Sequence, residues 1–214
     1  QSESARMSVL VDDLLLLARL DAGRPLEREP VDLSRLAIDV TSDARVARRE
    51  HHWRLDLPSD PILVRGDEHR LHQVLANLMS NAGKHTPSGS TVSVALRVER
   101  APGPDSRAAA DGGMLERGIP PSAPRVELSI TDDGPGIPPE QLPDLFERFT
   151  RGDTSRARDL EASGKSTGLG LAIVDAVVAA HGGSITVTSR PGRTRFAIYL
   201  PLLPEPADMA DIAG

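Results

Sequence analysis

Two glycine-containing loops in the second half of the sequence have the residue types that bind phosphate groups. The first is 132–138 (DDGPGIP), and the second, 164–174 (GKSTGLGLAIV), leads into an apolar helix. Such a loop exposes backbone N–H groups at the positive end of a helix, which favours a bound anion. Between the loops, 145–153 (LFERFTRGD) combines aromatic and arginine residues. Together the three segments predict a pocket for a phosphate-bearing ligand.

The helix predicted over residues 67–86 carries a second group of polar residues that suits such a ligand. Its core-facing stripe consists of Leu71, Val74, Leu75, Leu78 and Ala82. Beside this stripe, within an arc of about 100°, lie Asn77, Asn81, Lys84 and His85. An asparagine carbonyl oxygen is a hard ligand that suits Mg²⁺, and a lysine ammonium can meet a phosphate as a point charge. The alternative is a hydrogen-bonded asparagine pair on a solvated helix face.

Two familiar phosphate-binding motifs are excluded by their spacing. The run GKST at 164–167 resembles the end of a P-loop, but that motif needs a glycine at position 159, which is Asp159. The run GLG at 168–170 resembles a dinucleotide fingerprint, which requires a preceding strand and a third glycine, where Ile173 stands.

The composition restricts the kinds of partner. The chain has 214 residues, enough for one or two domains, and an apolar content of 39% that supports a core. Its formal net charge of −6 argues against nucleic acid as the main partner. The absence of cysteine excludes disulfides, thiolate metal sites and a cysteine nucleophile. No run approaches the about 18 apolar residues of a membrane-spanning helix.

The first predicted helix covers residues 4–22 and is amphipathic. Its apolar stripe comprises Met7, Leu10, Val11, Leu14, Leu15, Leu17 and Ala18. Since a lone helix cannot bury this stripe, we expect it to pack on the rest of the domain, or to form half of a helical hairpin or part of a dimer bundle. It begins without a clear cap, which suggests a piece cut from a longer protein. Residues 25–31 are expected to form a linker.

The remaining elements are expected to form the walls and floor of the pocket. Asp32 should cap a helix over 33–48. Strands are expected at 52–57, 62–64, 91–98 and 126–130, the last two as an antiparallel pair, with a terminal hairpin at 185–188 and 194–200. A short helical piece at 139–149 should expose Phe146 and Phe149, and a long helix should cover 169–181. The less regular segments are expected to be an insertion without chemistry (101–124), a lid (151–167) and a disordered tail (203–214).

Four segments, in this order, resemble the catalytic, ATP-binding domain of bacterial sensor histidine kinases of two-component systems. Residues 72–87 (HQVLANLMSNAGKHTP) resemble the N box of that family, and 132–138 the G1 box. The F box and the G2 box are similar to 145–153 and 166–174. The resemblance implies an α/β sandwich of the Bergerat type, with a mixed sheet of about five strands under three helices, over residues 32–202.

The resemblance also assigns the first helix. Residues 3–24 (ESARMSVLVDDLLLLARLDAGR) look like the second helix of the hairpin that dimerises and receives the phosphoryl group. The first helix of that hairpin carries the acceptor histidine followed by an acidic residue. None of the six histidines has this context: His51, His52, His69, His72, His85 and His181. The resemblance therefore implies that residues 1–24 are a remnant of a hairpin whose acceptor helix is missing.

Several residues match positions of the family that contact adenine. Asp132 matches the carboxylate that accepts a hydrogen bond from the adenine amino group, and Asp133 is expected to be solvated. Gly134 and Gly136 permit close backbone approach. His85 stands where the family often has tyrosine as a wall of the adenine site.

Other residues match positions that contact Mg²⁺ or the phosphates. Asn81 matches the Mg²⁺ ligand and Asn77 a second position near the metal. Lys84 matches a phosphate contact, and Arg151 an arginine that reaches the terminal phosphate from the lid, a role that Arg148 could take instead. Asn81, Lys84 and Arg151 are thus the implied catalytic residues. The nucleotide pocket implied by the resemblance further includes Ile137, Phe149, Thr167, Gly168, Leu169, Gly170 and Leu171. Ser166 departs from the family, which often has glycine there.

The implied function is that of a protein-histidine kinase. It would transfer the γ-phosphoryl group of Mg-ATP to a histidine of its own hairpin and then to an aspartate of a response regulator. We expect these 214 residues to bind ATP without phosphorylating themselves. The resemblance also implies a homodimeric full-length sensor in the bacterial inner membrane, with this part in the cytoplasm. The alternatives are an ATPase clamp of the gyrase, Hsp90 or MutL type, and a non-catalytic nucleotide-binding module.

Overall fold

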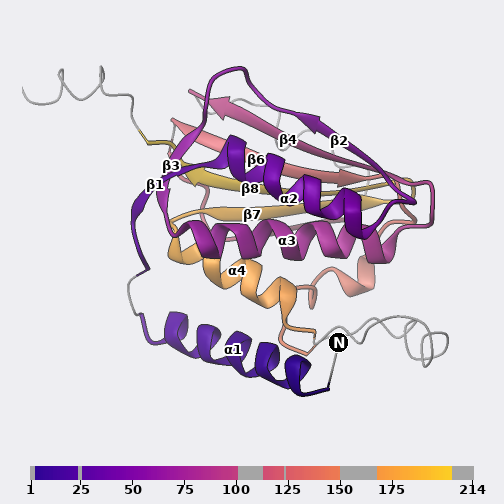
Figure 1. Cartoon of the computed structure of the whole chain (residues 1–214), viewed down its shortest axis with the longest axis horizontal. Coiled ribbons are helices and arrows are strands. Elements are labelled where there is room, and N and C mark those ends of the chain that lie inside the picture. The colour runs from indigo at the N-terminus through magenta and orange to yellow at the C-terminus, as the bar shows by residue number, and fades with distance from the viewer. Residues whose placement is uncertain (1–2, 24–25, 101–112, 123, 150–167, 204–214) are drawn as a thin grey trace, which may run out of the picture.

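The protein is an α/β sandwich in which three helices cover one face of a six-stranded sheet (Figure 1). A computed structural model describes residues 3–23, 26–100, 113–122, 124–149 and 168–203. Its α-helices are α1 (Glu3–Asp21), α2 (Leu33–Ala47), α3 (Glu68–His85) and α4 (Gly170–Ala180). Its strands are β1 (Glu29–Asp32), β2 (His52–Asp56), β3 (Leu63–Gly66), β4 (Thr91–Glu99), β5 (Gly113–Arg117), β6 (Arg125–Asp132), β7 (Ser184–Arg190) and β8 (Arg193–Pro201).

The strand order in the large sheet is β2-β4-β6-β8-β7-β5. β2 and β4 are parallel because the chain crosses between them through helix α3, whereas every other neighbouring pair is antiparallel. β4 pairs with β6 from Val92 opposite Asp132 to Glu99 opposite Arg125. This register places Asp132, the last residue of the central strand β6, opposite Val92 near the start of β4.

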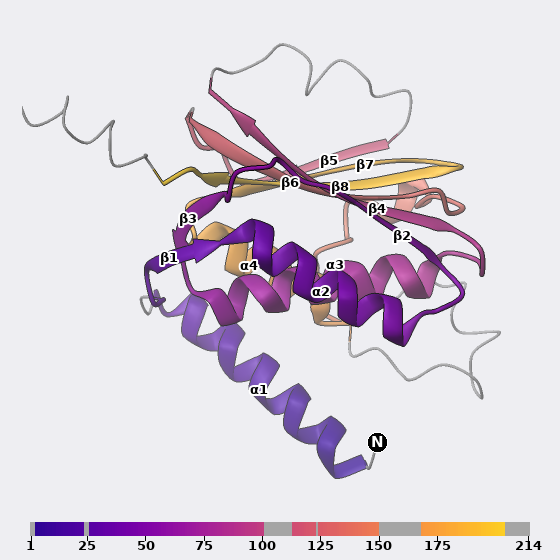
Figure 2. The same ribbon diagram turned by 45° about the horizontal axis from the view of Figure 1, so that its top comes forward.

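Helix α3 lies between α2 and α4 on the sheet, and α1 packs on the far side of these helices, where it contacts α4 (Figure 2). The side chains of Leu71, Leu75 and Leu78 are at most 1% exposed, and the opposing sheet face contributes Val92, Val94 and Leu96, all fully buried. Burial of apolar side chains between the two layers therefore fixes α3 against the sheet. Among the described residues, no helix is long and apolar enough to cross a membrane.

Most predicted elements are confirmed, and two helix starts have the expected caps. The side chain of Asp32 accepts hydrogen bonds from the N–H groups of Ser34 and Arg35 at the start of α2. Asp67 accepts from the N–H of Arg70 at the start of α3. The terminal hairpin is formed by β7 and β8.

Two segments predicted to lack regular structure contain strands. Residues 29–32, within and beside the predicted linker, form β1, which pairs antiparallel with β3 in a separate two-stranded sheet. Residues 113–117, within the predicted insertion, form β5, which pairs with β7 at the edge of the large sheet. The estimate of about five strands was therefore too low, because both strands are short and pair with distant segments.

The predicted exposure of Phe146 was wrong, and most of the apolar stripe predicted for α1 does not pack on the rest of the domain. Phe146 was predicted to be exposed, but it is buried, with 4% exposure. The segment after the 3-10 helix η2 (Pro139–Gln141) turns its side chain into the core. In α1 the buried residues are Leu16 and Leu17, while most of the predicted stripe is exposed: Met7, Val11, Leu14 and Leu15. This helix is apolar on two faces, so periodicity alone did not identify the face that contacts α4.

Candidate functional site

The predicted polar face of α3 lies beside the start of α4. The side-chain amide nitrogen of Asn77 donates to the carbonyl oxygen of Gly170 at 3.2 Å. A Cβ atom on Gly170 would lie 3.5 Å from the Asn77 amide carbon and oxygen, so the helices approach closely here. The structure thus brings Asn77 of α3 together with Gly170 of the second glycine loop.

The end of α3 carries the other predicted residues. Asn81 is half-buried, one turn after Asn77, and Lys84 and His85 are exposed in the last turn. Partial burial lowers the pKa of Lys84, and the nearby positive charge of Arg48 lowers it further. An approaching anion would stabilise the charged form of the Lys84 side chain.

Gly134 of the first glycine loop lies close to Thr86, the residue at the end of α3. Asp132 is 8% exposed, and one of its carboxylate oxygens accepts the N–H of Gly134 at 3.0 Å. A Cβ atom on Gly134 would lie 2.6 Å from Cγ2 of Thr86, so a larger residue would force the loop away from α3. Thr86 was not predicted as a site residue. The signal that could have found it is its position directly after the polar face.

The carboxyl group of Asp132 has a perturbed pKa. Burial raises the pKa to about 6, Asp133 raises it too, and the hydrogen bond from Gly134 partly opposes the rise. Asp133 is exposed, as predicted, and its side chain accepts the N–H of Thr91 at 2.9 Å. A buried carboxyl beside a glycine loop is a candidate functional group, because protein sites often perturb pKa values in this way.

Two hydroxyl groups on the terminal hairpin fix the rest of this loop. Gly136 has φ of 85°, and a Cβ atom there would lie 2.6 Å from the carbonyl oxygen of Arg190. The N–H of Ile137 donates to Oγ of Ser189 at 2.8 Å, and that oxygen lies 3.1 Å from Oγ1 of Thr194. Ser189 and Thr194 are two further residues near the loop that the sequence did not identify. Thr194 lies directly opposite Asp132 in the sheet.

The aromatic segment meets the second glycine loop through its backbone. The N–H of Phe149 donates to the carbonyl oxygen of Gly168 at 3.0 Å. Phe149 has φ of 64°, unusual for a bulky residue, and its side chain is 58% exposed. Leu169 is fully buried and Leu171 half-buried. Arg148 forms an ion pair with Asp21 of α1 at 2.6 Å.

Some predicted site residues cannot be placed. Arg151 and Thr167, and the predicted lid of 151–167, lie outside the described residues. Within the described ranges, no group of three or more histidine, cysteine or acidic residues could hold a metal ion. A divalent cation at this site would depend on the amide oxygens of α3 and on oxygens of its ligand. Mg²⁺ commonly binds in this way, with few protein ligands and several from phosphates.

The arrangement suits a nucleotide. Asp132 is a buried acceptor at one end of the site, and the N-terminus of α4 supplies positive charge beside Asn77. The polar face of α3 offers amide oxygens, and Lys84 in its last turn adds a cation. An acceptor for a base, donors for phosphates and hard oxygen ligands are the groups that a magnesium nucleotide requires.

Comparison with known proteins agrees with this geometry. Residues 66–204 match the family described as "Histidine kinase-, DNA gyrase B-, and HSP90-like ATPase". The chain is 52% identical over 201 residues to the probable sensor histidine kinase TcrY of Mycobacterium tuberculosis, covering 94% of this chain and 37% of TcrY. It is 45% identical to the sensor histidine kinase TrcS of the same organism, covering 95% of this chain and 35% of TrcS. The chain thus spans about a third of the length of these curated relatives.

Solved structures have the same fold. The mycobacterial sensor histidine kinase MprB matches with a TM-score of 0.62 and 32% identity, covering 83% of this chain and all of the solved chain. Full-length ShkA, solved in complex with AMPPNP, matches with a TM-score of 0.69 and 29% identity, covering 94% of this chain and 36% of that one.

Proposed function

This chain belongs to the histidine kinase-, DNA gyrase B- and HSP90-like ATPase family, as the ATP-binding catalytic domain of a bacterial sensor histidine kinase, and we propose that it presents Mg-ATP for transfer of the γ-phosphoryl group to a histidine. The observation that carries this proposal is that α3 borders both glycine loops. Asn77 contacts Gly170 of the second loop, and Thr86 contacts Gly134 of the first.

The adenine end of the proposed site is formed by Asp132 and its loop. The ionised carboxylate accepts a hydrogen bond from the adenine amino group, and Gly134 and Gly136 leave room for the base. Ile137 and the exposed side chains of His85 and Phe149 form the walls. The raised pKa of Asp132 supports this role, because a buried carboxylate without a cation beside it gains a partner when the amino group binds.

The phosphate end is formed by the second loop and the end of α3. Backbone N–H groups from Gly168 to Leu171 and the ammonium of Lys84 bind phosphate oxygens. Asn81, with Asn77 beside it, holds Mg²⁺ through amide oxygens. The amide nitrogen of Asn77 is engaged by Gly170, so that its oxygen faces away from that contact. Bound Mg²⁺ would neutralise charge on the phosphates.

The remaining proposed contacts with the nucleotide come from the predicted lid, residues 151–167. Arg151 would reach the terminal phosphate and Thr167 would contact the nucleotide, as the family resemblance implies. Positioned cations and N–H groups account for most of what phosphoryl transfer requires from a protein. We therefore propose Asn81, Lys84 and Arg151 as the catalytic residues.

The acceptor and the downstream partner belong to the proposal for the whole protein. We propose that the acceptor histidine lies outside these 214 residues, on a helix that pairs with α1. We also propose a homodimeric sensor held in the membrane, with this domain in the cytoplasm, and an aspartate of a response regulator as the final acceptor. TcrY and TrcS are named sensor histidine kinases, which supports a histidine as the acceptor.

Calorimetric titration with ATP, with and without Mg²⁺, tests the binding site. Asp132→Asn should abolish binding, because an amide cannot replace the anionic acceptor without presenting its own donor. Asp133→Asn is the matched control, since that neighbour is exposed and its side chain accepts the N–H of Thr91. Equal loss in both variants, or binding in neither the wild type nor the variants, contradicts the proposed pocket.

Transfer needs a separate experiment. With γ-labelled ATP, the 214 residues should acquire no acid-labile, base-stable phosphohistidine, but they should label a co-purified helical hairpin that contains the acceptor. Rapid release of free phosphate without labelling would instead indicate an ATPase clamp. The sequence of α3 argues against that outcome, because no acidic residue that could activate water lies between His69 and His85.

A further inference from the structure

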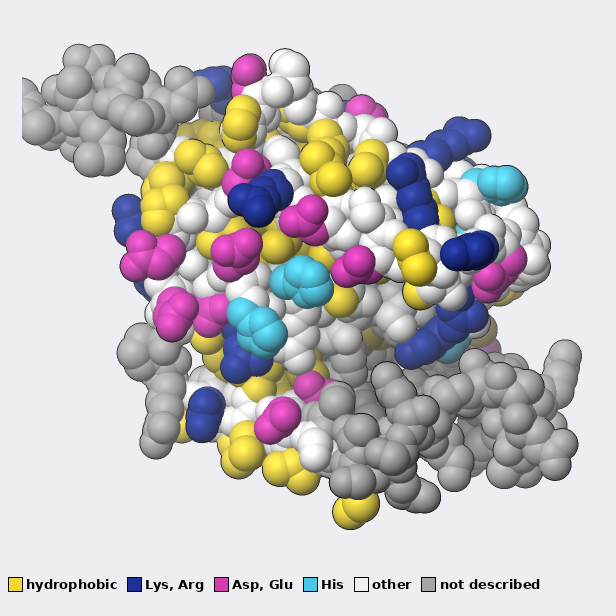
Figure 3. Space-filling view, viewed as in Figure 1, with side chains coloured by type: hydrophobic (Ala, Val, Ile, Leu, Met, Phe, Trp, Pro, Cys, Tyr) yellow, Lys and Arg dark blue, Asp and Glu magenta, His cyan; other side chains and the backbone are white. Residues whose placement is uncertain are grey.

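A basic hollow lies where α2 ends and β2 begins, and one of its lining residues, His51, contacts Thr86 beside the first glycine loop. We call it the α2–β2 hollow. Its volume is about 470 Å³, and it is lined by Arg45, Arg49, His51, His52, Trp53 and Arg54. Dark blue and cyan side chains gather at this end of the molecule in Figure 3. Such a concentration is unexpected in a chain whose formal net charge is −6.

The positive charge of the hollow is poorly neutralised. Glu50 is the single acidic residue between Asp43 and Asp56, and it lies 3.6 Å from Arg48. Within the described part of the chain, no carboxylate lies within 4.0 Å of Arg45, Arg49 or Arg54. Clustered cations of this kind create a positive potential that attracts anions.

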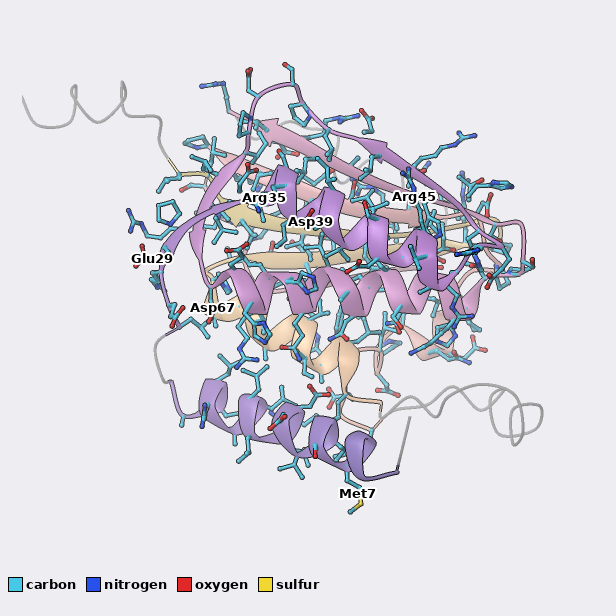
Figure 4. The ribbon with its side chains drawn as sticks, in the orientation of Figure 1. Met7, Glu29, Arg35, Asp39, Arg45 and Asp67 are labelled. Atoms are coloured by element: carbon cyan, nitrogen blue, oxygen red, sulfur yellow. The ribbon has the colours of Figure 1, made fainter. Side chains whose placement is uncertain are left out.

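The hollow is held in shape by hydrogen bonds. Arg45, labelled on α2 in Figure 4, donates through Nη2 to the carbonyl oxygen of Trp53 at 3.0 Å. The indole N–H of Trp53 donates to the carbonyl oxygen of Arg48 at 3.1 Å. These contacts fix the end of α2 against β2. The cations on both elements are therefore pre-positioned, which reduces the entropy lost when a ligand binds.

A buried histidine forms part of the lining of the hollow. The His51 side chain is 2% exposed, and its Nε2 lies 2.8 Å from Oγ1 of Thr86. That hydroxyl donates to the carbonyl oxygen of Ala82, so Nε2 of His51 is the donor toward it. Nδ1 of His51 makes no hydrogen bond among the described residues, and Oε1 of Glu50 lies 3.6 Å from it. His51 therefore links the segment before β2 to the end of α3.

Protection of the sheet edge explains only part of this cluster. β2 is the edge strand of the large sheet, and charged residues on an edge deter pairing with other chains. This accounts for Arg54 and His52, which are on the strand. It does not account for Arg49, which follows α2.

We propose that the α2–β2 hollow binds a small soluble anion that carries two or more phosphate groups. Arginine guanidinium groups match phosphate oxygens in bidentate geometry, and the number of cations exceeds what one monoester would neutralise. Trp53 is 7% exposed, so the hollow offers no aromatic side chain for insertion into a bilayer.

The experiment uses the indole of Trp53, the single tryptophan in the sequence. The 214-residue protein is titrated with inorganic pyrophosphate at constant ionic strength, with sodium chloride as the matched salt, and Trp53 fluorescence is recorded. We expect a saturable change. The double variant Arg49→Gln/Arg54→Gln should weaken the apparent affinity by about tenfold or more, because two charge-assisted contacts are lost.

The control variant is Arg19→Gln/Arg35→Gln, which removes the same charge from α1 and from the first turn of α2, where Arg35 is 80% exposed. It should retain the pyrophosphate response. Circular dichroism confirms that both double variants are folded. Three outcomes overturn the proposal: no saturable response, equal affinity in the two double variants, or binding to vesicles of anionic phospholipid without a response to pyrophosphate.

Discussion

The side-chain amide of Asn77 donates to the carbonyl oxygen of Gly170 at 3.2 Å and ties the middle of α3 to the first residue of α4. The two residues are far apart in the sequence, and each belongs to a different motif. The contact sets the distance between the oxygens of α3 and the N–H groups of the second loop. A single hydrogen bond thus determines how well the two halves of the proposed phosphate site fit one ligand.

Asn77→Ala should weaken ATP binding by about tenfold and lower the free energy of unfolding by about 1 kcal/mol. The stability loss arises because the Gly170 carbonyl loses its donor, and the affinity loss because the first turn of α4 is no longer anchored. Calorimetry and urea denaturation measure the two effects. Gln73→Ala is the control, since Gln73 lies one turn earlier and contacts Asp13 of α1. The prediction fails if Gln73→Ala reduces ATP affinity as much as Asn77→Ala.

Asp132→Asn should stabilise the protein at pH 7.5 while it abolishes ATP binding. Burial raises the pKa of Asp132 from 3.8 to about 6, so the native state holds this proton more tightly than the unfolded chain. Wild-type stability therefore falls as pH rises from about 4 to about 6 and remains lower above that range. With allowance for partial access to solvent, the stability gain of the variant is about 2 kcal/mol at pH 7.5.

Urea denaturation of both proteins at pH 7.5 and pH 4.5 measures this gain. The difference between them should be smaller at pH 4.5, where the wild-type carboxyl is protonated. A variant that is less stable than the wild type at both pH values would show that Asp132 is needed for folding rather than for ligand binding.

His181→Gln should reduce the sensitivity of stability to mild acid. Nε2 of His181 accepts the N–H of Asp67 at 3.0 Å, and Nδ1 donates to the carbonyl oxygen of Val177 at 2.7 Å (Asp67 is labelled in Figure 4). Burial of the ring lowers the pKa of His181 from 6.5, and the hydrogen bond to the carbonyl oxygen of Val177 partly opposes this shift. The stability that it contributes is therefore present above about pH 6.5 and is lost as pH falls below that value.

The measurement compares urea midpoints of wild type and His181→Gln between pH 8 and pH 5. The difference between the two proteins removes the contribution of Asp132, which has the opposite sign in this range. Parallel midpoint curves would show that His181 is not the acid-sensitive group.

Leu17→Ala and Leu15→Ala should differ sharply although the two residues are near neighbours on α1. Leu17 is 1% exposed and Leu15 is 51% exposed. Truncation of the buried Leu17 side chain leaves a cavity and should lower the free energy of unfolding by about 2–5 kcal/mol. Truncation of the exposed Leu15 side chain should lower it by about 0.5 kcal/mol or less. Thermal or urea denaturation measures both. Equal small effects would mean that α1 is not packed on the other helices in solution.

The parts of this fold that could be predicted rest on local patterns. Asp32 and Asp67 were recognisable as caps, and the leucine stripe of α3 faces the core as its period indicates. The proximity of Asn77 to the second glycine loop was also predicted, from residue chemistry and family resemblance. Each of these features depends on residues within a few turns of one another, or on a motif.

The rest depends on contacts that no local pattern encodes. β5 consists of five residues, and its partner β7 comes much later in the chain. Thr86, Ser189 and Thr194 adjoin the first glycine loop only because the sheet register and the end of α3 bring them there. The buried face of α1 could not be identified because both faces are apolar, and only contact with α4 distinguishes them.

The position of β5 has a consequence for the order in which the sheet is assembled. The segment between the neighbouring strands β4 and β6 supplies a strand at the opposite edge, so β5 has no partner until β7 has been synthesised and has folded. Such long-range pairing forms late, and an outer strand with one neighbour opens first in native-state hydrogen exchange. Arg117 of β5 is paired with Glu147 at 3.3 Å, so opening of β5 would break this surface ion pair. The edge strand therefore opens at a lower free-energy cost than the central strands, and its amide hydrogens should exchange before those of β6 and β8.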